Sequence, residues 1–288
     1  MIDDRFVAHR SLLFTVAYEM LGSAADADDV LQEAWLRWAD VDHAQVRDPR
    51  AYLIRVVTRQ ALNRLRTVSR RREEYVGEWL PEPLLTSPDV ADDVELAESV
   101  SIAMLTVLET LGPTERAVFV LREVFDMPYG EIAEAIGKSA ATVRQIARRA
   151  RDHVAERRPR MAVSRSEQEA VVERFLVALR TGQLQDLMEI MAPDVVLVAD
   201  GGGLATAVRV PVHGAERIAK LFSGAIRRHG PFDTTTLWLN GAPAGRIEVD
   251  GELTLVSFAV EDGQVTRMYA MRNPQKLARL GEPAELTR

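Results

Sequence analysis

The chain has 288 residues, a formal net charge of −7 and no cysteine, which excludes disulfides and thiolate metal sites. Its five histidines are scattered without metal-ligand spacing, so we expect neither a metal nor another cofactor. No apolar run is long enough to span a membrane, and the acidic amino terminus is unlike a signal peptide. We therefore expect a cytoplasmic protein.

The negative total is an average over unlike parts. Residues 76–98 carry seven acids and no base, whereas eight arginines between Arg50 and Arg72 follow one another with no acid between them. Such patterning is compatible with nucleic-acid binding by the basic parts, so the net charge does not exclude it.

The first predicted elements are three helices in residues 1–75. Apolar spacing predicts a helix over 5–21, Ser23 is the expected N-cap of a second helix to about Ala39, and Asp48-Pro49 begins a third that runs to about Arg66. Residues 76–98 form an acidic linker that contains EWLPEPLL at 78–85. Its two prolines exclude a helix interior or a central strand there.

Residues 99–160 are predicted to form a second helical domain. A helix near Pro128, a turn at Gly137 and a helix capped by Ser139 have the lengths of a helix-turn-helix. From 166 to 288, helical stretches alternate with β-branched runs joined by Asp-Gly turns at 250 and 262. The expected fold class is therefore multidomain, with two all-α domains followed by an α+β domain whose sheet is curved and mostly antiparallel.

The helix over 140–154 separates its faces cleanly. Val143, Ile146, Ala147, Ala150 and Val154 should face the core, while amides and small residues come first on the other face and arginines follow. That order suits a recognition helix in a DNA major groove, and a merely solvated basic face is the alternative. The candidate contacts are Ser139, Ala141, Thr142, Arg144, Gln145, Arg148 and Arg149, with Arg151 also outward.

The helix over 49–66 is the second basic element. A polar face with arginines beside an aromatic ring suits strand-separated DNA, although any amphipathic helix with a solvated arginine face looks similar. Its candidate residues are Tyr52, Arg55, Arg59, Gln60, Asn63, Arg64 and Arg66.

The helix after Ser23 has the opposite sign. Acids in its first turn favour the helix dipole, but Leu36, Trp35 and Trp38 in the next turns predict a mixed surface typical of a protein interface. The candidate partner-binding residues are Asp26, Asp28, Asp29, Gln32, Glu33 and Trp35.

Three motifs in this order resemble regions 2 and 4 of the bacterial extracytoplasmic-function (ECF) sigma factors: DADDVLQEAWLRW, DPRAYLIRVVTRQALNRLR and LGPTERAVFVLREVFDMPYGEIAEAIGKSAATVRQIARRAR. The resemblance implies that the partners are core RNA polymerase (β′ and β subunits) and promoter DNA. The acidic helix would bind the coiled coil of the β′ subunit, the basic helix would open and read the −10 element, and the helix from Ser139 would read −35. Many relatives have an aspartate where this chain has Asn63, so no −10 base preference is implied.

Residues 166–288 resemble the cone-shaped SnoaL-like (nuclear-transport-factor-2-like) domain fused to the forty-first ECF group. That resemblance implies a built-in regulator and rests on three motifs, WLPEPL, DGGG and NPQKL. The implied regulatory residues are Trp79, Leu80, Pro81, Glu82, Pro83, Leu84, Asp200, Gly201, Gly202, Gly203, Asn273, Pro274, Lys276 and Leu277.

Other interpretations of these features remain open at the sequence level. The glycines can be a tight turn, and NPQKL can be a helix start with Asn273 as its cap. The last domain can instead be a small-ligand receptor or a residual cyclase-like enzyme, with candidates Asp200, Arg209, His213, Trp238, Asn240 and Tyr269. A polar enclosed cavity would favour catalysis, and an apolar or filled interior would favour regulation. A LuxR-like activator shares the helix-turn-helix but lacks the first helical domain.

Overall fold

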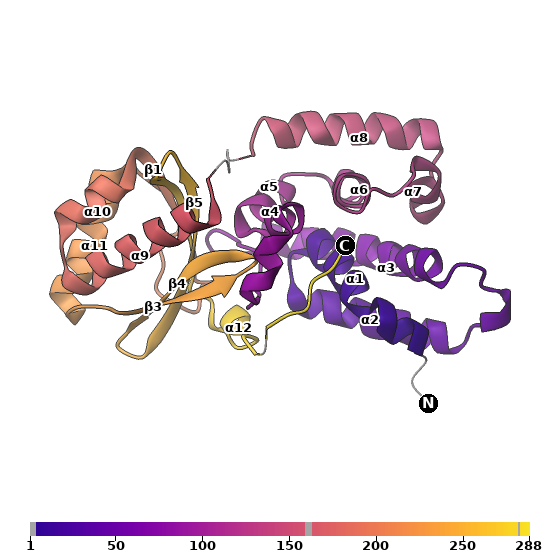
Figure 1. Ribbon diagram of the computed structural model, residues 1–288, viewed down its shortest axis with the longest axis horizontal. Coiled ribbons are helices and arrows are strands. Elements are labelled where there is room, and N and C mark those ends of the chain that lie inside the picture. Colours follow the sequence, from indigo (N-terminus) through magenta and orange to yellow (C-terminus); the bar gives the residue numbers. More distant parts are fainter. Residues whose placement is uncertain (1–3, 159–162, 282) are drawn as a thin grey trace. The chain divides into compact units, whose positions relative to one another are not determined.

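The computed structural model of the chain (Figure 1) describes residues 4–158, 163–281 and 283–288. It divides into two compact units, which we describe separately. The first consists of Met1–Glu73, Leu105–Arg158 and Glu285–Arg288, and the second of Glu74–Met104 and Pro159–Ala284. The acidic linker thus belongs to the unit that contains the last domain. No helix in the described ranges is long and apolar enough to cross a membrane.

The first unit is built from helices joined by short connections. Its amino-terminal part contains α1 (Asp4–Leu21), α2 (Ala24–Ala39) and α3 (Pro49–Glu73). The predicted caps are confirmed, because Ser23 Oγ accepts from the N–H of Asp26 at 3.1 Å and Asp48 Oδ1 accepts from that of Ala51 at 3.0 Å. These bonds satisfy N–H groups that the first helical turn leaves free, so they fix where the helices begin.

The helix-turn-helix follows in the same unit. After α6 (Pro113–Phe119) and a π-helical turn (Val120–Val124), α7 (Tyr129–Ile136) ends at Gly137, and α8 (Ala140–Ala155) begins after Ser139. Gly137 has φ +67°, a left-handed conformation that glycine adopts without strain. Ser139 Oγ accepts from the N–H of Thr142 at 3.1 Å, which confirms the predicted turn and cap.

The second unit is built on one six-stranded mixed sheet, so the expected α+β class is confirmed. The strands are β1 (Met191–Asp200), β2 (Val212–His213), β3 (Asp233–Leu239), β4 (Ala242–Val249), β5 (Glu252–Glu261) and β6 (Gln264–Met271), in spatial order β2-β1-β6-β5-β4-β3. Only the β1–β6 pair is parallel in this sheet. The predicted Asp-Gly turns lie at positive φ and close the β4–β5 and β5–β6 hairpins.

Both faces of the sheet are buried, and different parts of the chain cover them. On one face Val195, Leu197 and Ala199 of β1 join a core with α9 (Arg165–Thr181), α10 (Leu184–Ile190) and α11 (Ala215–His229). On the other, the alternate β1 residues Val196 and Val198 pack with residues from outside the last domain. These residues are Leu80 of the linker and Ile102 and Ala103 at the start of α5 (Ile102–Leu108).

Candidate functional site

Helix α8 has the two faces that its sequence predicts. The five residues expected to face inward are all at most 5% exposed, and those expected to face outward are exposed: Ser139, Ala141, Thr142, Arg144, Gln145, Arg148, Arg149 and Arg151. A row of side chains beginning at the helix N-terminus is thus presented to solvent, with the small and amide-bearing residues first. This is the arrangement that a helix in a major groove requires.

The arginines of α8 are held only loosely. The side chains of Arg148 and Arg149 are 83% and 68% exposed, and their ion pairs with Asp152 and Glu115 measure 4.0 and 3.8 Å. The Arg144 guanidinium lies over the Tyr129 ring, 5.8 Å from its centre. Exposed ion pairs contribute at most about 1 kcal/mol to stability. These arginines can therefore leave their carboxylate partners and bind DNA phosphates at a small cost in free energy.

The basic helix α3 contacts the helix-turn-helix inside the first unit. Arg55 pairs with Glu134 at 2.8 Å, and Arg59 donates to the backbone oxygens of Glu134 and Ala135 at 2.8 and 3.1 Å. Those carbonyls end α7, where a helix leaves acceptors unpaired and carries partial negative charge. Two arginines expected at the −10 element are therefore engaged by α7 in this state.

The remaining candidates on α3 differ in their surroundings. Asn63 and Arg66 are exposed, while Arg64 forms ion pairs with Asp26 at 2.7 Å and Asp29 at 2.6 Å. Tyr52 is half-buried and packs against the Trp38 ring. Gln60 corrects the expectation of an outward residue, because it is only 5% exposed. Helix α3 contacts α1, α2, α6 and α7, so its buried face is wider than that of a helix packed in one domain.

The acidic helix α2 presents a mixed surface. Asp28, Asp29, Gln32 and Glu33 are exposed, Leu36 is 59% exposed, and Trp35 is half-buried with its ring edge-on to Phe6. The expectation that both tryptophans belong to this surface is wrong for Trp38. It is fully buried and stacks on His43, because it forms part of the core between α2 and α3.

A second arginine-centred contact within the first unit escaped the sequence analysis. Arg116 of α6 is 1% exposed, donates through Nε to the backbone oxygen of Glu19 on α1 at 2.9 Å, and pairs with Glu109. Desolvation by burial lowers the pKa of Arg116 to about 9, so it is still charged at neutral pH. Together with Arg55 and Arg59, it joins the amino-terminal helices to the helix-turn-helix.

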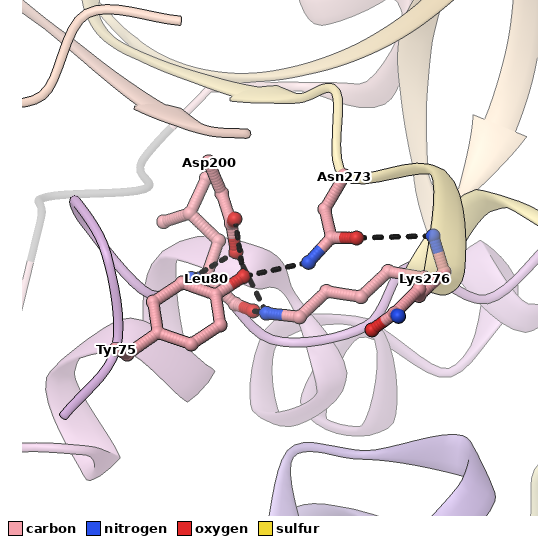
Figure 2. A network of polar contacts seen from close by, with 6 residues as sticks. Tyr75, Leu80, Asp200, Asn273 and Lys276 are labelled. Atoms are coloured by element: carbon pink, nitrogen blue, oxygen red, sulfur yellow. Dashed lines mark hydrogen bonds and ion pairs between the residues drawn. The ribbon is translucent and has the colours of Figure 1, made fainter. Parts of the chain in front are cut away.

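In the second unit, the three motifs WLPEPL, DGGG and NPQKL meet around one buried carboxylate, that of Asp200 (Figure 2). Asp200 ends β1 and is fully buried. Its Oδ1 accepts from the Tyr75 hydroxyl at 2.6 Å, and its Oδ2 accepts from the backbone N–H of Leu80 at 2.9 Å and from Lys276 Nζ at 2.7 Å. We call this cluster of Tyr75, Leu80, Asp200, Asn273 and Lys276 the clasp.

Lys276 and Asn273 complete the clasp from the carboxyl-terminal side. Lys276, 7% exposed, also donates to the backbone oxygen of Leu80 and lies 4.0 Å from the centre of the Trp79 ring. Asn273 donates to the Tyr75 oxygen at 2.7 Å, and its own Oδ1 caps α12 (Pro274–Leu277) through the N–H of Gln275. The helix-start interpretation of NPQKL is thus correct, and the same residues also bind the linker. Because the Asp200 carboxylate and the Lys276 ammonium are both buried, removing either one would leave the other charge without its partner, which is strongly destabilising.

The glycines of DGGG allow the linker to approach closely. Gly202 has φ +58°, and a Cβ placed on it would lie 2.9 Å from the Tyr75 oxygen. A Cβ on Gly203, at φ +72°, would lie 3.2 Å from Cβ of Val76. Both the left-handed backbone and the lack of space require glycine here.

Further along, the linker pairs with the edge strand β3. Leu85 bridges Leu239 in antiparallel fashion, and Leu84 and Asn240 exchange two bonds, each 2.9 Å long, between Leu84 N and Asn240 Oδ1 and between Asn240 N and Leu84 O. Asn240 Nδ2 also donates to the backbone oxygen of Val100 at 2.8 Å. An extended segment added to an open sheet edge gains main-chain hydrogen bonds and places alternate side chains in pockets. In WLPEPL, Leu80, Pro81, Pro83 and Leu84 are buried, while Trp79 and Glu82 are half-buried.

The candidates for catalysis do not converge on a cavity. Asp200 and Asn240 bind the linker, Tyr269 is buried in the core with Leu80, and His213 is exposed. The Trp238 ring lies under Arg165. A groove of about 420 Å³ does lie beside the clasp, lined by Val76, Gly77 and the loop over 201–209, including Arg209. The sheet face itself is filled by apolar side chains.

Replacing Tyr75 with phenylalanine is expected to lower the free energy of unfolding of the second unit by about 1–3 kcal/mol, because Asp200 Oδ1 and Asn273 Nδ2 lose a buried partner. Burial, followed by the hydrogen bond and charge of Asp200, raises the pKa of Tyr75 above its usual value. The folded state therefore holds this proton more tightly than the unfolded chain does, so the contribution is full below pH about 10 and falls above it.

Urea unfolding of wild type and Tyr75→Phe at neutral and alkaline pH measures both effects. Tyr129→Phe, the same change at a half-buried tyrosine of the first unit, is the matched control. Equal unfolding free energies for wild type and Tyr75→Phe at neutral pH would show that the hydroxyl does not support the clasp.

Comparison with known proteins agrees with this arrangement. The sigma-70 region 2 family matches residues 6–71, and the sigma-70 region 4 family matches residues 101–154. The chain is 39% identical to the ECF RNA polymerase sigma factor SigJ of Mycobacterium tuberculosis, over 94% of this chain and 91% of SigJ. It is 34% identical to the probable ECF sigma factor SigI of the same species, over 94% and 92% of the two chains.

Among solved structures, the crystal structure of Mycobacterium tuberculosis SigJ superimposes with a TM-score of 0.79 and 34% identity. The match covers 96% of this chain and 98% of that one. Both helical domains and the α+β domain therefore have a counterpart in a single related protein. The chain belongs to the ECF RNA polymerase sigma factors, the promoter-recognising subunits of RNA polymerase.

Proposed function

We propose that this sigma factor regulates itself through its C-terminal α+β domain, which holds the linker between the two DNA-binding domains by means of the clasp. The observation that carries the proposal is the convergence of WLPEPL, DGGG and NPQKL on the buried Asp200. In the restrained state the clasp is closed, and polymerase or another partner releases it. We place the protein in the cytoplasm, where its polymerase and promoters are.

The roles within the sigma domains are assigned as follows. Residues 1–75 bind core polymerase through the acidic surface of α2, on the β′ and β subunits, and α3 opens and reads the −10 element. Residues 99–160 read the −35 element through α8, residues 76–98 are the regulated linker, and residues 166–288 are the SnoaL-like regulator. Exposure of the α8 arginines and of Asp28, Gln32 and Glu33 supports these assignments.

The geometry of the first unit supports a restrained state. The −10 and −35 elements lie about 25 base pairs apart, which is about 85 Å at 3.4 Å per base pair. Here α3 touches α7 directly through Arg55 and Arg59, so the two reading helices are too close to reach both elements together. Promoter binding therefore requires these contacts to break.

The extended length of the linker supports the same interpretation. The linker over residues 76–98 has 23 residues and, fully extended, would span roughly 80 Å, which is close to the promoter spacing. With Leu80 held at Asp200 and Leu84 held at Asn240, that length is not available. Opening the clasp restores it, which couples the α+β domain to promoter recognition without any new contact to DNA.

A small-ligand receptor is the second candidate, and one observation favours it. The groove of about 420 Å³ lies between the linker at Val76 and the DGGG loop, so an occupant would touch both sides of the clasp. Filling it with a Val76→Trp substitution should change transcription if ligand entry is part of regulation. Transcription by wild type and by Val76→Trp is measured with and without added cell extract. If the extract changes the output of both proteins equally, ligand entry into this groove is not part of regulation.

The experiment that tests the proposed function is initiation by purified protein with core polymerase on fragmented genomic DNA, followed by sequencing of transcript 5′ ends. A sigma factor yields discrete start sites that share upstream elements and are absent with core alone. A requirement for another sigma subunit would contradict the assignment. Repeating the assay with a clasp variant tests regulation separately, because the proposal expects the same start sites at higher output.

A further inference from the structure

The last four residues, Glu285–Arg288, belong to the first compact unit, although the residues before them belong to the second. Leu286 is 7% exposed, while Glu285, Thr287 and Arg288 on either side are exposed. A single buried leucine between exposed residues outside any helix or strand is therefore an anchor for this segment.

Two polar contacts place this tail on α1. The N–H of Thr287 donates to Thr15 Oγ1 at 3.1 Å, and Ser11 Oγ donates to Glu285 Oε2 at 3.4 Å. Thr15 is fully buried, and its hydroxyl donates to the backbone oxygen of Ser11 at 2.9 Å. The Thr15 hydroxyl thus donates its one proton within α1, and a lone pair on the same oxygen accepts the hydrogen bond from the Thr287 N–H.

Ser11 and Thr15 are four residues apart, so they share one face of α1 and form a short polar strip among apolar positions. The strip binds two features of a peptide, an acidic side chain and the backbone N–H two residues later, and a buried apolar side chain lies between them. The sequence Glu285-Leu286-Thr287 supplies them in that order.

We propose that α1 carries a docking site for the carboxyl-terminal peptide of this same chain. The occupant is the segment over residues 285–288 of this chain, which is present at high effective concentration because it is covalently attached. Since α1 belongs to sigma region 2, the docked tail attaches the end of the regulatory domain to the domain that binds polymerase. This regulatory consequence rests on the proposed function, whereas the docking itself does not.

Amide hydrogen exchange of full-length protein tests the docking site at the Thr287 N–H. In wild type this amide is expected to exchange more slowly than the intrinsic rate for its sequence. Leu286→Asp should speed its exchange at least about tenfold, the factor expected for losing one buried leucine side chain. Thr287→Asp adds the same charge at the neighbouring exposed position and keeps the N–H donor, so protection should remain.

Thr15→Val provides the reciprocal test from the α1 side, because it keeps the side-chain shape and removes the acceptor. It should also release the Thr287 amide, with an unchanged circular dichroism spectrum as the check on folding. A Thr287 amide that is unprotected in wild type, or equally protected in Leu286→Asp, would overturn the docking site.

The docking site and the clasp can be tested independently. If self-regulation through the clasp is wrong, a clasp variant leaves transcription unchanged while the Thr287 amide stays protected. If the docking site is wrong, the amide exchanges freely whatever the clasp variant does to transcription.

Discussion

Replacing Asp200 with alanine is expected to release the linker from the α+β domain. The substitution leaves three buried donors without their acceptor, namely the Tyr75 hydroxyl, the Leu80 N–H and Lys276 Nζ. Removing one partner of a buried ion pair costs about 3–5 kcal/mol, because the remaining charge is stranded in a low-dielectric site. The closed clasp should therefore become the minor state.

Hydrogen exchange at the Leu80 amide measures this release directly. Its exchange should accelerate by about two orders of magnitude in Asp200→Ala, which corresponds to about 3 kcal/mol. Asp194→Ala removes an exposed aspartate from the same strand and serves as the control. In transcription with core polymerase, Asp200→Ala should exceed wild type and Asp194→Ala should match it. An unchanged Leu80 amide would mean that Asp200 does not hold the linker.

Removing Arg144, Arg148 and Arg149 together is expected to weaken −35-dependent promoter binding at least tenfold. These guanidiniums are exposed on α8 and lightly held, so they are available to phosphates and base edges. Each phosphate-contacting arginine that is lost should reduce the slope of log Kobs against log salt by about 1. The triple alanine variant should therefore bind at least tenfold more weakly at moderate salt, with a clearly shallower salt dependence.

The control for this variant is an equal loss of charge elsewhere. Arg217→Ala combined with Arg174→Ala and Arg228→Ala removes three arginines from helices of the second unit and should leave promoter affinity unchanged. If the α8 triple variant bound promoter DNA with wild-type affinity and salt slope, α8 would not be the −35 reader.

Local sequence signals predicted the helical domains well, for reasons that the structure makes plain. Caps such as Ser23, Asp48 and Ser139, together with the Gly137 turn, satisfy backbone groups within a few residues, so neighbouring sequence suffices to place them. The faces of α8 were predictable for a related reason. One face packs on a single core, and a 3.6-residue period describes that burial completely.

Residues whose surroundings come from distant parts of the chain were not predictable in this way. Gln60 is polar and has outward spacing, yet α3 meets both helical domains and the residue is buried. Trp38 packs against His43 and Tyr52 instead of facing a partner. Tyr75 carries no periodic signal at all, because its partner Asp200 lies 125 residues later in the sequence.

The three motifs that form the clasp were predictable only in part. The resemblance to a known group identified the motifs WLPEPL, DGGG and NPQKL. Only the tertiary structure shows that they meet at one carboxylate, that of Asp200. The burial of one sheet face by Leu80 of the linker and Ile102 of α5 likewise depends on strand order and curvature. Neither is encoded in the local pattern of the linker, which is acidic and interrupted by prolines.

The most direct test of regulation by the clasp is transcription by a chain in which the clasp can be locked. The sequence has no cysteine, so Val76→Cys with Gly203→Cys introduces the only two thiols. Their Cβ atoms would lie 3.2 Å apart, a few tenths of an ångström closer than a disulfide prefers. Because Gly203 has a left-handed backbone that favours glycine, the reduced double variant should hold the clasp less firmly than wild type, and the disulfide should close it again. With core polymerase, the oxidised double variant should be several-fold less active than its reduced form. Neither the Val76→Cys nor the Gly203→Cys single variant should respond to oxidation. Equal activity of the oxidised and reduced double variant would contradict control of this sigma factor by the clasp.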